Sequence, residues 1–151
     1  MKQKLLFLSL GFALPILILA ALALHFGGVG SAMSWLNGKP FHISPSECRL
    51  GKQSPGTEVT VTFSLKNLSG NKLSVSGFES NCSCVFTEEI PATISPKETV
   101  RLHVQVRFPE SGSAFNQTVV FLITTPDKTL KVPAQITASL VPPQNEEAGS
   151  N

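Results

Sequence analysis

Three cysteines carry the most reactive side chains of this 151-residue chain: Cys48, and the pair Cys82 and Cys84 in Asn81-Cys82-Ser83-Cys84. In an oxidising compartment, an odd number of cysteines leaves one thiol free or paired between chains. A disulfide from Cys48 to Cys82 or Cys84 would close a loop of about 35 residues and contribute about 4 kcal/mol. Three reduced cysteines, or a Cys82–Cys84 bridge, are the alternatives. The Cys82–Cys84 bridge needs a turn, because alternate Cα atoms of a strand lie about 6.6 Å apart.

The same thiols are candidate metal ligands. Cys82, Cys84 and Cys48, with His42 or His103, would make a four-ligand set for zinc, and thiolates also suit a low-coordinate Cu(I) site. A single residue separates Cys82 from Cys84, whereas zinc knuckles have about two to four intervening residues. We therefore predict no metal site and no cofactor, and we keep thiol or copper/zinc handling as the alternative function.

Acid and base residues are too few for a recognisable active site. Asp127 is the only aspartate and lies in a turn-like Thr-Pro-Asp-Lys, while His103 occupies the exposed face of a predicted strand. Glu88 and Glu89 are adjacent, so on a strand they would point to opposite faces and could not share a substrate. The chain has no nucleophile elbow and no glycine-rich phosphate loop. We predict that it is not an enzyme and name no catalytic residue.

The elements that position these residues are predicted to be β-strands. Apolar and polar residues alternate over 59–65, 100–108 and 130–140, which is typical of antiparallel strands with one buried face. The continuous apolar and β-branched run at 118–125 indicates a more central strand. Pro133 cannot donate to a ladder, so its strand is expected to lie at an edge there.

Polar turns separate these strands about every dozen residues, a spacing that predicts an all-β sandwich. We expect about seven strands in an antiparallel β-sandwich, near residues 41–50, 57–67, 72–79, 82–87, 98–108, 115–125 and 129–140.

An uncharged apolar run, Leu5 to Leu24, follows Lys2 and Lys4. Its length is close to the roughly 20 residues that cross a bilayer and exceeds the roughly 7–15 of a signal-peptide core. The run therefore predicts a single N-terminal transmembrane helix, a signal anchor at 5–26. A cleaved signal peptide is the alternative. Because the positive charges precede the run, both interpretations put the remainder outside the cytoplasm.

The rest of the chain divides by composition. Residues 1–4 would be a cytoplasmic stub, 27–38 a linker rich in Gly and Ser, and 39–141 the β-sandwich. Residues 142–151 are mostly Pro, Gln, Asn, Glu, Gly and Ser, which predicts a disordered tail. From Lys39 onward, ten basic residues balance ten acidic ones, so we expect no nucleic-acid partner.

Four short motifs follow one another in a recognisable order: a strand ending in Asn at 61–67, the Cys-Ser-Cys segment at 81–84, a proline-framed turn at 91–98, and a Thr-Pro hairpin at 124–127. Together they cover about a hundred residues. The stretch from about Lys39 to Leu140 resembles the DUF1573 family, immunoglobulin-like domains related to the ASPM/SPD-2/Hydin and major-sperm-protein group.

The resemblance implies an immunoglobulin-like sandwich, bacterial and often held behind a signal or lipoprotein anchor, and it implies no activity. Ser83 replaces the glycine usual between the two cysteines, and Cys48 is an addition to the family pair. We expect a single-pass protein whose domain lies on the periplasmic side of a bacterial inner membrane, or is secreted after cleavage. As a non-catalytic module, it would bind an unknown protein or envelope component through loops or an open sheet edge.

Overall fold

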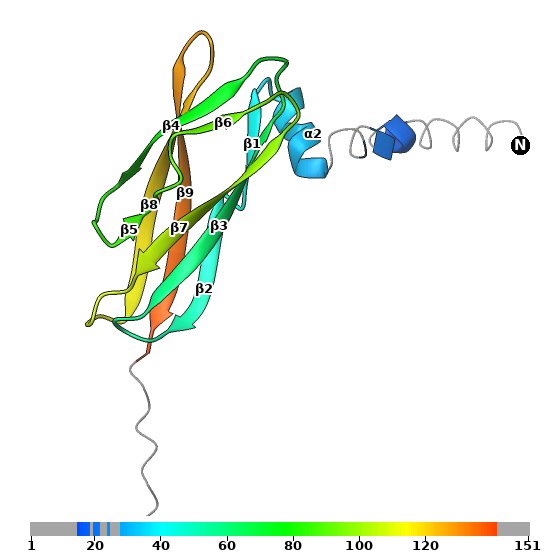
Figure 1. Cartoon of the computed structure of the whole chain (residues 1–151). Helices are drawn as coiled ribbons and strands as arrows, with labels where there is room; N and C mark the ends of the chain where they lie inside the picture. Colours follow the sequence, from blue (N-terminus) through cyan, green and yellow to red (C-terminus); the bar gives the residue numbers. More distant parts are fainter. Residues whose placement is uncertain (1–14, 19, 22–23, 25–27, 142–151) are drawn as a thin grey trace, which may run out of the picture.

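The computed structural model describes residues 15–18, 20–21, 24 and 28–141. Within 28–141 the chain forms one helix followed by nine strands (Figure 1). The elements are α2 (Val29–Leu36), β1 (Phe41–Ser44), β2 (Glu47–Gln53), β3 (Glu58–Asn67), β4 (Leu73–Ser80), β5 (Val85–Phe86), β6 (Ala92–Ile94), β7 (Thr99–Arg107), β8 (Ala114–Thr124) and β9 (Thr129–Leu140).

Two sheets form the sandwich. The four-stranded sheet has the order β1-β3-β7-β5, and the five-stranded sheet has the order β2-β9-β8-β4-β6. All neighbouring pairs are antiparallel except β2 and β9, which are parallel. The all-β sandwich predicted from the turn spacing is therefore confirmed, with one parallel pair in place of a purely antiparallel arrangement.

The core lies between the sheets and follows the two-residue period of the strands. On β3, Val61, Phe63 and Leu65 are buried while Thr60 and Thr62 are exposed. The same alternation on β7, β8 and β9 supplies most of the remaining core. The fully buried large side chains are Phe63, Phe108, Phe121, Leu65, Leu73, Ile94, Leu102, Ile123, Ile136, Val75, Val104 and Val106.

The expected first strand, 41–50, is two strands in different sheets. β1 pairs with β3, and β2 pairs with β9. Only Pro45 and Ser46 separate β1 from β2, and a proline has no N–H to continue a ladder. Because no turn reverses the chain at this point, β2 enters the second sheet in the direction it already had.

Two other predicted boundaries differ from the structure. Only Val85 and Phe86 of the expected strand 82–87 are a strand, and the cysteine segment before them is a turn. Residues 92–94 form the short strand β6 against β4. Three residues are too few to show an alternating pattern, which explains why the sequence did not reveal this strand.

The predicted membrane anchor at 5–26 is contradicted. Among the residues that the structure describes, none belongs to a helix long and apolar enough to cross a membrane. Helix α2 has eight residues and is about 12 Å long, whereas a span needs about 30 Å. Most of the predicted anchor, the stub 1–4 and the tail 142–151 lie outside the described residues. Within the predicted linker, Val29–Leu36 is the helix α2, which lies beside β1 (Figure 1).

Candidate functional site

The first half of β9 is an open sheet edge. β8 pairs with β9 along its whole length, but β2 begins to pair only at Gln135, whose N–H donates to the carbonyl of Ser46. Residues 129–134 therefore have a strand partner on one side only. The edge position predicted from Pro133 is confirmed for this half of β9, while the second half lies between β2 and β8.

Main-chain groups of this edge point away from the sheet. Along an antiparallel strand, successive residues direct their N–H and C=O groups to alternate sides. Since the N–H of Gln135 points away from β8, the main-chain groups of Thr129, Lys131 and Pro133 do so as well. The N–H groups of Thr129 and Lys131 are thus main-chain donors that the β8 ladder does not use, and Pro133 ends the series because it has no N–H.

A groove of about 770 Å³ runs beside this edge. One side is β1, the edge strand of the other sheet, with Phe41 and His42; the other is β9, with Leu130 and Val132. Phe41 and Val132 are each 8% exposed, so the floor of the groove is apolar. Two open edges from different sheets therefore border a single depression.

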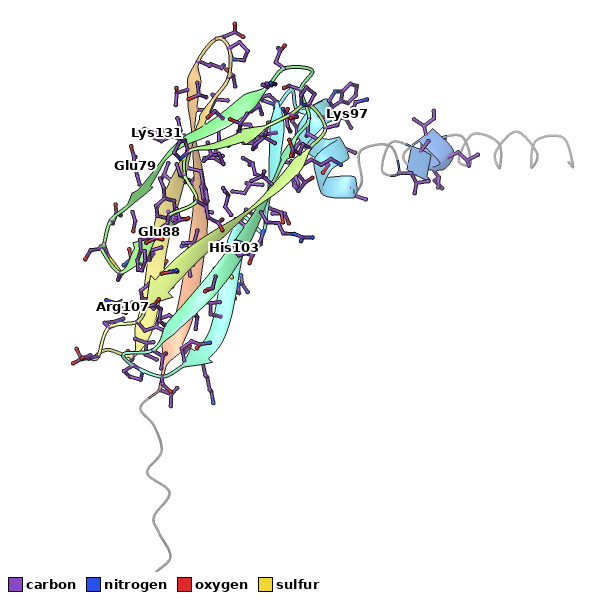
Figure 2. The ribbon with its side chains drawn as sticks, in the orientation of Figure 1. Glu79, Glu88, Lys97, His103, Arg107 and Lys131 are labelled. Atoms are coloured by element: carbon purple, nitrogen blue, oxygen red, sulfur yellow. A yellow bond between two sulfur atoms is a disulfide. The ribbon has the colours of Figure 1, made fainter. Side chains whose placement is uncertain are left out.

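Positive charge surrounds the groove. Lys39, Lys128 and Lys131 line it together with one acidic residue, Asp127. Lys131 also forms an ion pair with Glu79 at 3.0 Å (Figure 2), but both side chains are substantially exposed, so this pair contributes little to stability. The groove consequently offers an apolar floor within a predominantly basic rim.

His42 connects the groove to helix α2. Its Nδ1 is 3.0 Å from the Oγ of Ser34, and its ring packs so closely on Gly30 that a Cβ there would lie 2.9 Å from the ring. Burial, with the positive charges of Lys66 and Lys39, lowers the pKa of His42. The neutral ring is therefore the form that fits between α2 and β1.

Acidification is expected to loosen the contact between α2 and β1. The pKa of His42 is below 6.5 only while the ring is packed, so the stability of the contact is complete above pH 6.5 and falls as the pH drops through the lowered pKa. Trp35 lies on α2 and is the only tryptophan. Its fluorescence spectrum should change between about pH 8 and about pH 5.

A His42→Asn variant is the control for this pH effect, because asparagine retains a hydrogen-bonding amide and does not titrate. Its Trp35 spectrum should be nearly independent of pH over the same interval. A pH response equal to that of the unaltered chain would show that another group causes it.

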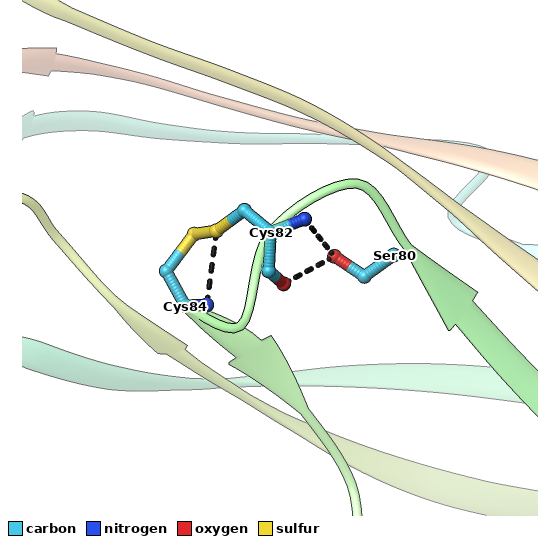
Figure 3. The surroundings of a disulfide bond; sticks show 3 residues. All are labelled: Ser80, Cys82 and Cys84. Carbon is cyan, nitrogen blue, oxygen red and sulfur yellow. Dashed lines mark hydrogen bonds between the residues drawn. A yellow bond between two sulfur atoms is a disulfide. The ribbon is translucent and has the colours of Figure 1, made fainter.

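The second candidate site is the cysteine turn between β4 and β5. Cys82 and Cys84 form a disulfide with a Cα–Cα distance of 5.2 Å (Figure 3), shorter than the spacing in an extended strand. Ser80 holds the turn: its Oγ donates to the carbonyl of Cys82 at 2.9 Å and accepts from the N–H of Cys82 at 3.3 Å. The N–H of Cys84 donates to the Sγ of Cys82 at 2.9 Å.

The expected bridge from Cys48 to Cys82 or Cys84 is not present, and Cys48 is free. Cys48 lies on β2, at one edge of its sheet, while the turn leaves β4, three strands further across. Three strand spacings are about 14 Å, well beyond the reach of a disulfide. Burial raises the pKa of the Cys48 thiol, which makes it a weak nucleophile.

The other candidate residues remain apart. Among the described residues, no group of three or more His, Cys, Asp or Glu side chains is placed to hold a metal ion. His103 contacts Glu89 instead: both its N–H and its Nδ1 lie 2.7 Å from that carboxylate. Hydrogen bonds from His103 lower the pKa of Glu89. β5 pairs with β7 only at Gln105 and Val106, and the Glu89 carboxylate accepts the N–H of His103 beyond the end of that pairing. Glu89 therefore stabilises the edge of β7.

The residue pattern did not reveal the groove as a whole. Pro133 was the one signal that pointed to it, because it indicated an edge on β9. Nothing in the residue pattern placed β1 opposite that edge, since the two segments lie far apart in the chain and belong to different sheets.

Comparisons with known proteins agree with this architecture. The family described as "Protein of unknown function (DUF1573)" matches residues 41–138, whereas no curated protein matches the sequence. The fold is similar to the human ASH / PapD-like domain 7 of CEP192, with TM-score 0.54, 8% identity, and coverage of 68% of this chain and 86% of that one.

Two bacterial structures are also similar. One is a Porphyromonas gingivalis W83 protein of unknown function, with TM-score 0.55, 11% identity, and coverage of 66% of this chain and 46% of that one. The other is the Vibrio cholerae VesB protease, with TM-score 0.57, 14% identity, and coverage of 74% and 36%. This chain spans less than half of either protein, and such low identities show the fold alone.

Proposed function

The chain belongs to the DUF1573 family, whose function is unknown, and from this premise we propose that it is a non-catalytic binding domain for an extended segment of a partner protein. The segment would add as a strand to the open edge at 129–134 of β9. The observation that carries the proposal is the set of outward main-chain groups at Thr129 and Lys131, which lie beside a groove with an apolar floor.

Strand addition uses both features of this site. Main-chain hydrogen bonds along the edge supply affinity without regard to sequence, and alternate side chains of the added strand enter the groove and supply specificity. Phe41 and Val132 favour apolar side chains at those alternate positions.

The basic rim of the groove adds a preference for a negatively charged segment. Lys39, Lys128 and Lys131 outnumber Asp127 around the groove, so carboxylates on the side chains that remain outside the groove would be attracted. We therefore commit to an acidic segment with alternating apolar residues. A saccharide of the cell envelope is disfavoured, because it cannot form the main-chain ladder that this edge offers.

A Lys131→Pro variant tests strand addition, because it removes an outward N–H that the folded sheet does not use. The probe is a fluorescein-labelled synthetic peptide of alternating valine and glutamate, followed by fluorescence anisotropy. We expect binding to weaken about tenfold in addition to any effect of the lost charge. The variant should remain folded by circular dichroism.

Lys131→Gln is the matched control, since it removes the same charge and the ion pair with Glu79 but retains the N–H. Its affinity should fall only about two- to threefold. Equal affinities of the proline and glutamine variants would refute strand addition. A probe with lysine in place of glutamate should bind more weakly than the acidic one; if it binds equally, the charge preference is wrong.

A further inference from the structure

Hydrogen bonds hold the cysteine turn in addition to its disulfide. The hydrogen bonds of Ser80 to Cys82, and the bond from the N–H of Val85 to the carbonyl of Cys82, already define it. A bridge between residues two apart closes a minimal loop, and the entropy that a disulfide removes from the unfolded chain falls as the loop shortens. Stabilisation of the fold is therefore a poor explanation for this bridge.

The bridge is also accessible. Cys82 and Cys84 are both partly exposed, and exposed disulfides are typically the labile ones. A shallow groove of about 450 Å³ lies at the turn, and its lining includes Cys82 and the apolar side chains of Phe86 and Ile90. Cys84 does not line this groove and packs against the core instead. An incoming thiol consequently reaches the Sγ of Cys82 more easily than that of Cys84.

From these observations we propose that Cys82–Cys84 is a thiol–disulfide exchange site that accepts two electrons from a dithiol substrate. This inference is independent of the proposed peptide groove, which lies between β1 and β9 and contains neither cysteine. The substrate class is a peptide or small molecule with two neighbouring thiols.

The exchange balances without a further reactant. A substrate thiolate attacks the Sγ of Cys82, the Cys82–Cys84 bond breaks, and its electron pair goes to Cys84, which takes up a proton. The second substrate thiolate then attacks the substrate sulfur of the mixed disulfide and releases the Cys82 thiolate, which is protonated in turn. The substrate leaves as a disulfide, having lost two electrons and two protons, and the protein keeps two thiols.

One main-chain group favours the release of Cys82. The N–H of Cys84 donates to the Sγ of Cys82, and a hydrogen bond to the charged form stabilises a thiolate. Cys48 is not part of this site, because it lies on β2, three strands away from β4, from which the turn leaves.

Alkylation rates of the single-cysteine forms of the full chain test the assignment of roles. Both variants carry Cys48→Ser; one adds Cys84→Ser and leaves Cys82, the other adds Cys82→Ser and leaves Cys84. With iodoacetamide at neutral pH, Cys82 should react about tenfold faster than Cys84. Equal rates, or a faster Cys84, would overturn the assignment.

Exchange itself is measured in the Cys48→Ser chain with dithiothreitol as the dithiol. We expect Cys82–Cys84 to be reduced while circular dichroism remains native, and to re-form with oxidised dithiothreitol. A synthetic disulfide peptide of residues 80–86 is the control, and its exchange with dithiothreitol should be slower. A disulfide that is reduced only when the chain unfolds, or that reacts no faster than the peptide, would refute a site built by the fold.

Discussion

Replacing Phe121 by alanine is expected to lower the free energy of unfolding by about 4 kcal/mol. Phe121 is fully buried on β8 and contacts two other rings edge to face, Phe63 at 5.3 Å and Phe78 at 5.4 Å between centroids. Phe63 belongs to the other sheet, so this ring pair joins the two layers of the sandwich. The substitution removes the aromatic contacts and leaves a cavity between the sheets. Urea denaturation followed by circular dichroism measures the loss.

Val120→Ala is the matched control, since Val120 neighbours Phe121 on the same strand but faces away from the core and is only partly buried. It should cost about 1 kcal/mol or less. A loss for Phe121→Ala as small as that for Val120→Ala would mean that the facing side chains collapse into the cavity and that the ring contacts matter little.

The second large effect is expected for Asn67→Ala, with a loss of about 3 kcal/mol. Asn67 ends β3 and its side chain is fully buried. Its Nδ2 donates to the carbonyls of Asn71 at 2.7 Å and Ile94 at 3.1 Å, and its Oδ1 accepts from the N–H and the Oγ of Ser69. Alanine would remove the side-chain donor to the carbonyls of Asn71 and Ile94 and free the turn after β3.

Asn116→Ala is the control, because it also removes an asparagine side chain but does not disturb the hydrogen bonds of Asn67. Asn116 also precedes a Ser/Thr by two positions, but it is exposed and accepts one hydrogen bond, from Gln135. Its replacement should change stability by less than about 0.5 kcal/mol. Thermal unfolding of both variants measures the difference, and similar melting temperatures for the two would disprove the role of Asn67.

The strands could be predicted from the sequence, because successive side chains of a strand alternate between the buried and the exposed face. Phe63 stands between the polar residues Thr62 and Ser64, and this alternation predicts that its side chain is buried. The same pattern predicts the buried residues of β7 and β9. Asn67 was part of a family motif, but its hydrogen bond to the carbonyl of Ile94 could not be predicted, because Ile94 lies on another strand, 27 residues further along the chain.

The functional sites were less predictable. The two neighbouring cysteines were recognised as a pair, but the expected bridge to Cys48 was wrong, since disulfide pairing depends on distances across the sheet that residue types do not encode. Pro133 indicated an edge, yet the groove exists because β1 of the other sheet borders that edge.

Local side-chain chemistry thus establishes the strands, their buried faces and the family of this chain, because alternation and turn residues act over a few neighbouring positions. The split of the first strand at Pro45, the parallel pairing of β2 with β9, the open edge at 129–134 and the separation of Cys48 from the cysteine turn all depend on which distant segments become neighbours. Packing of the whole core selects those neighbours, so they became visible only in the assembled sandwich.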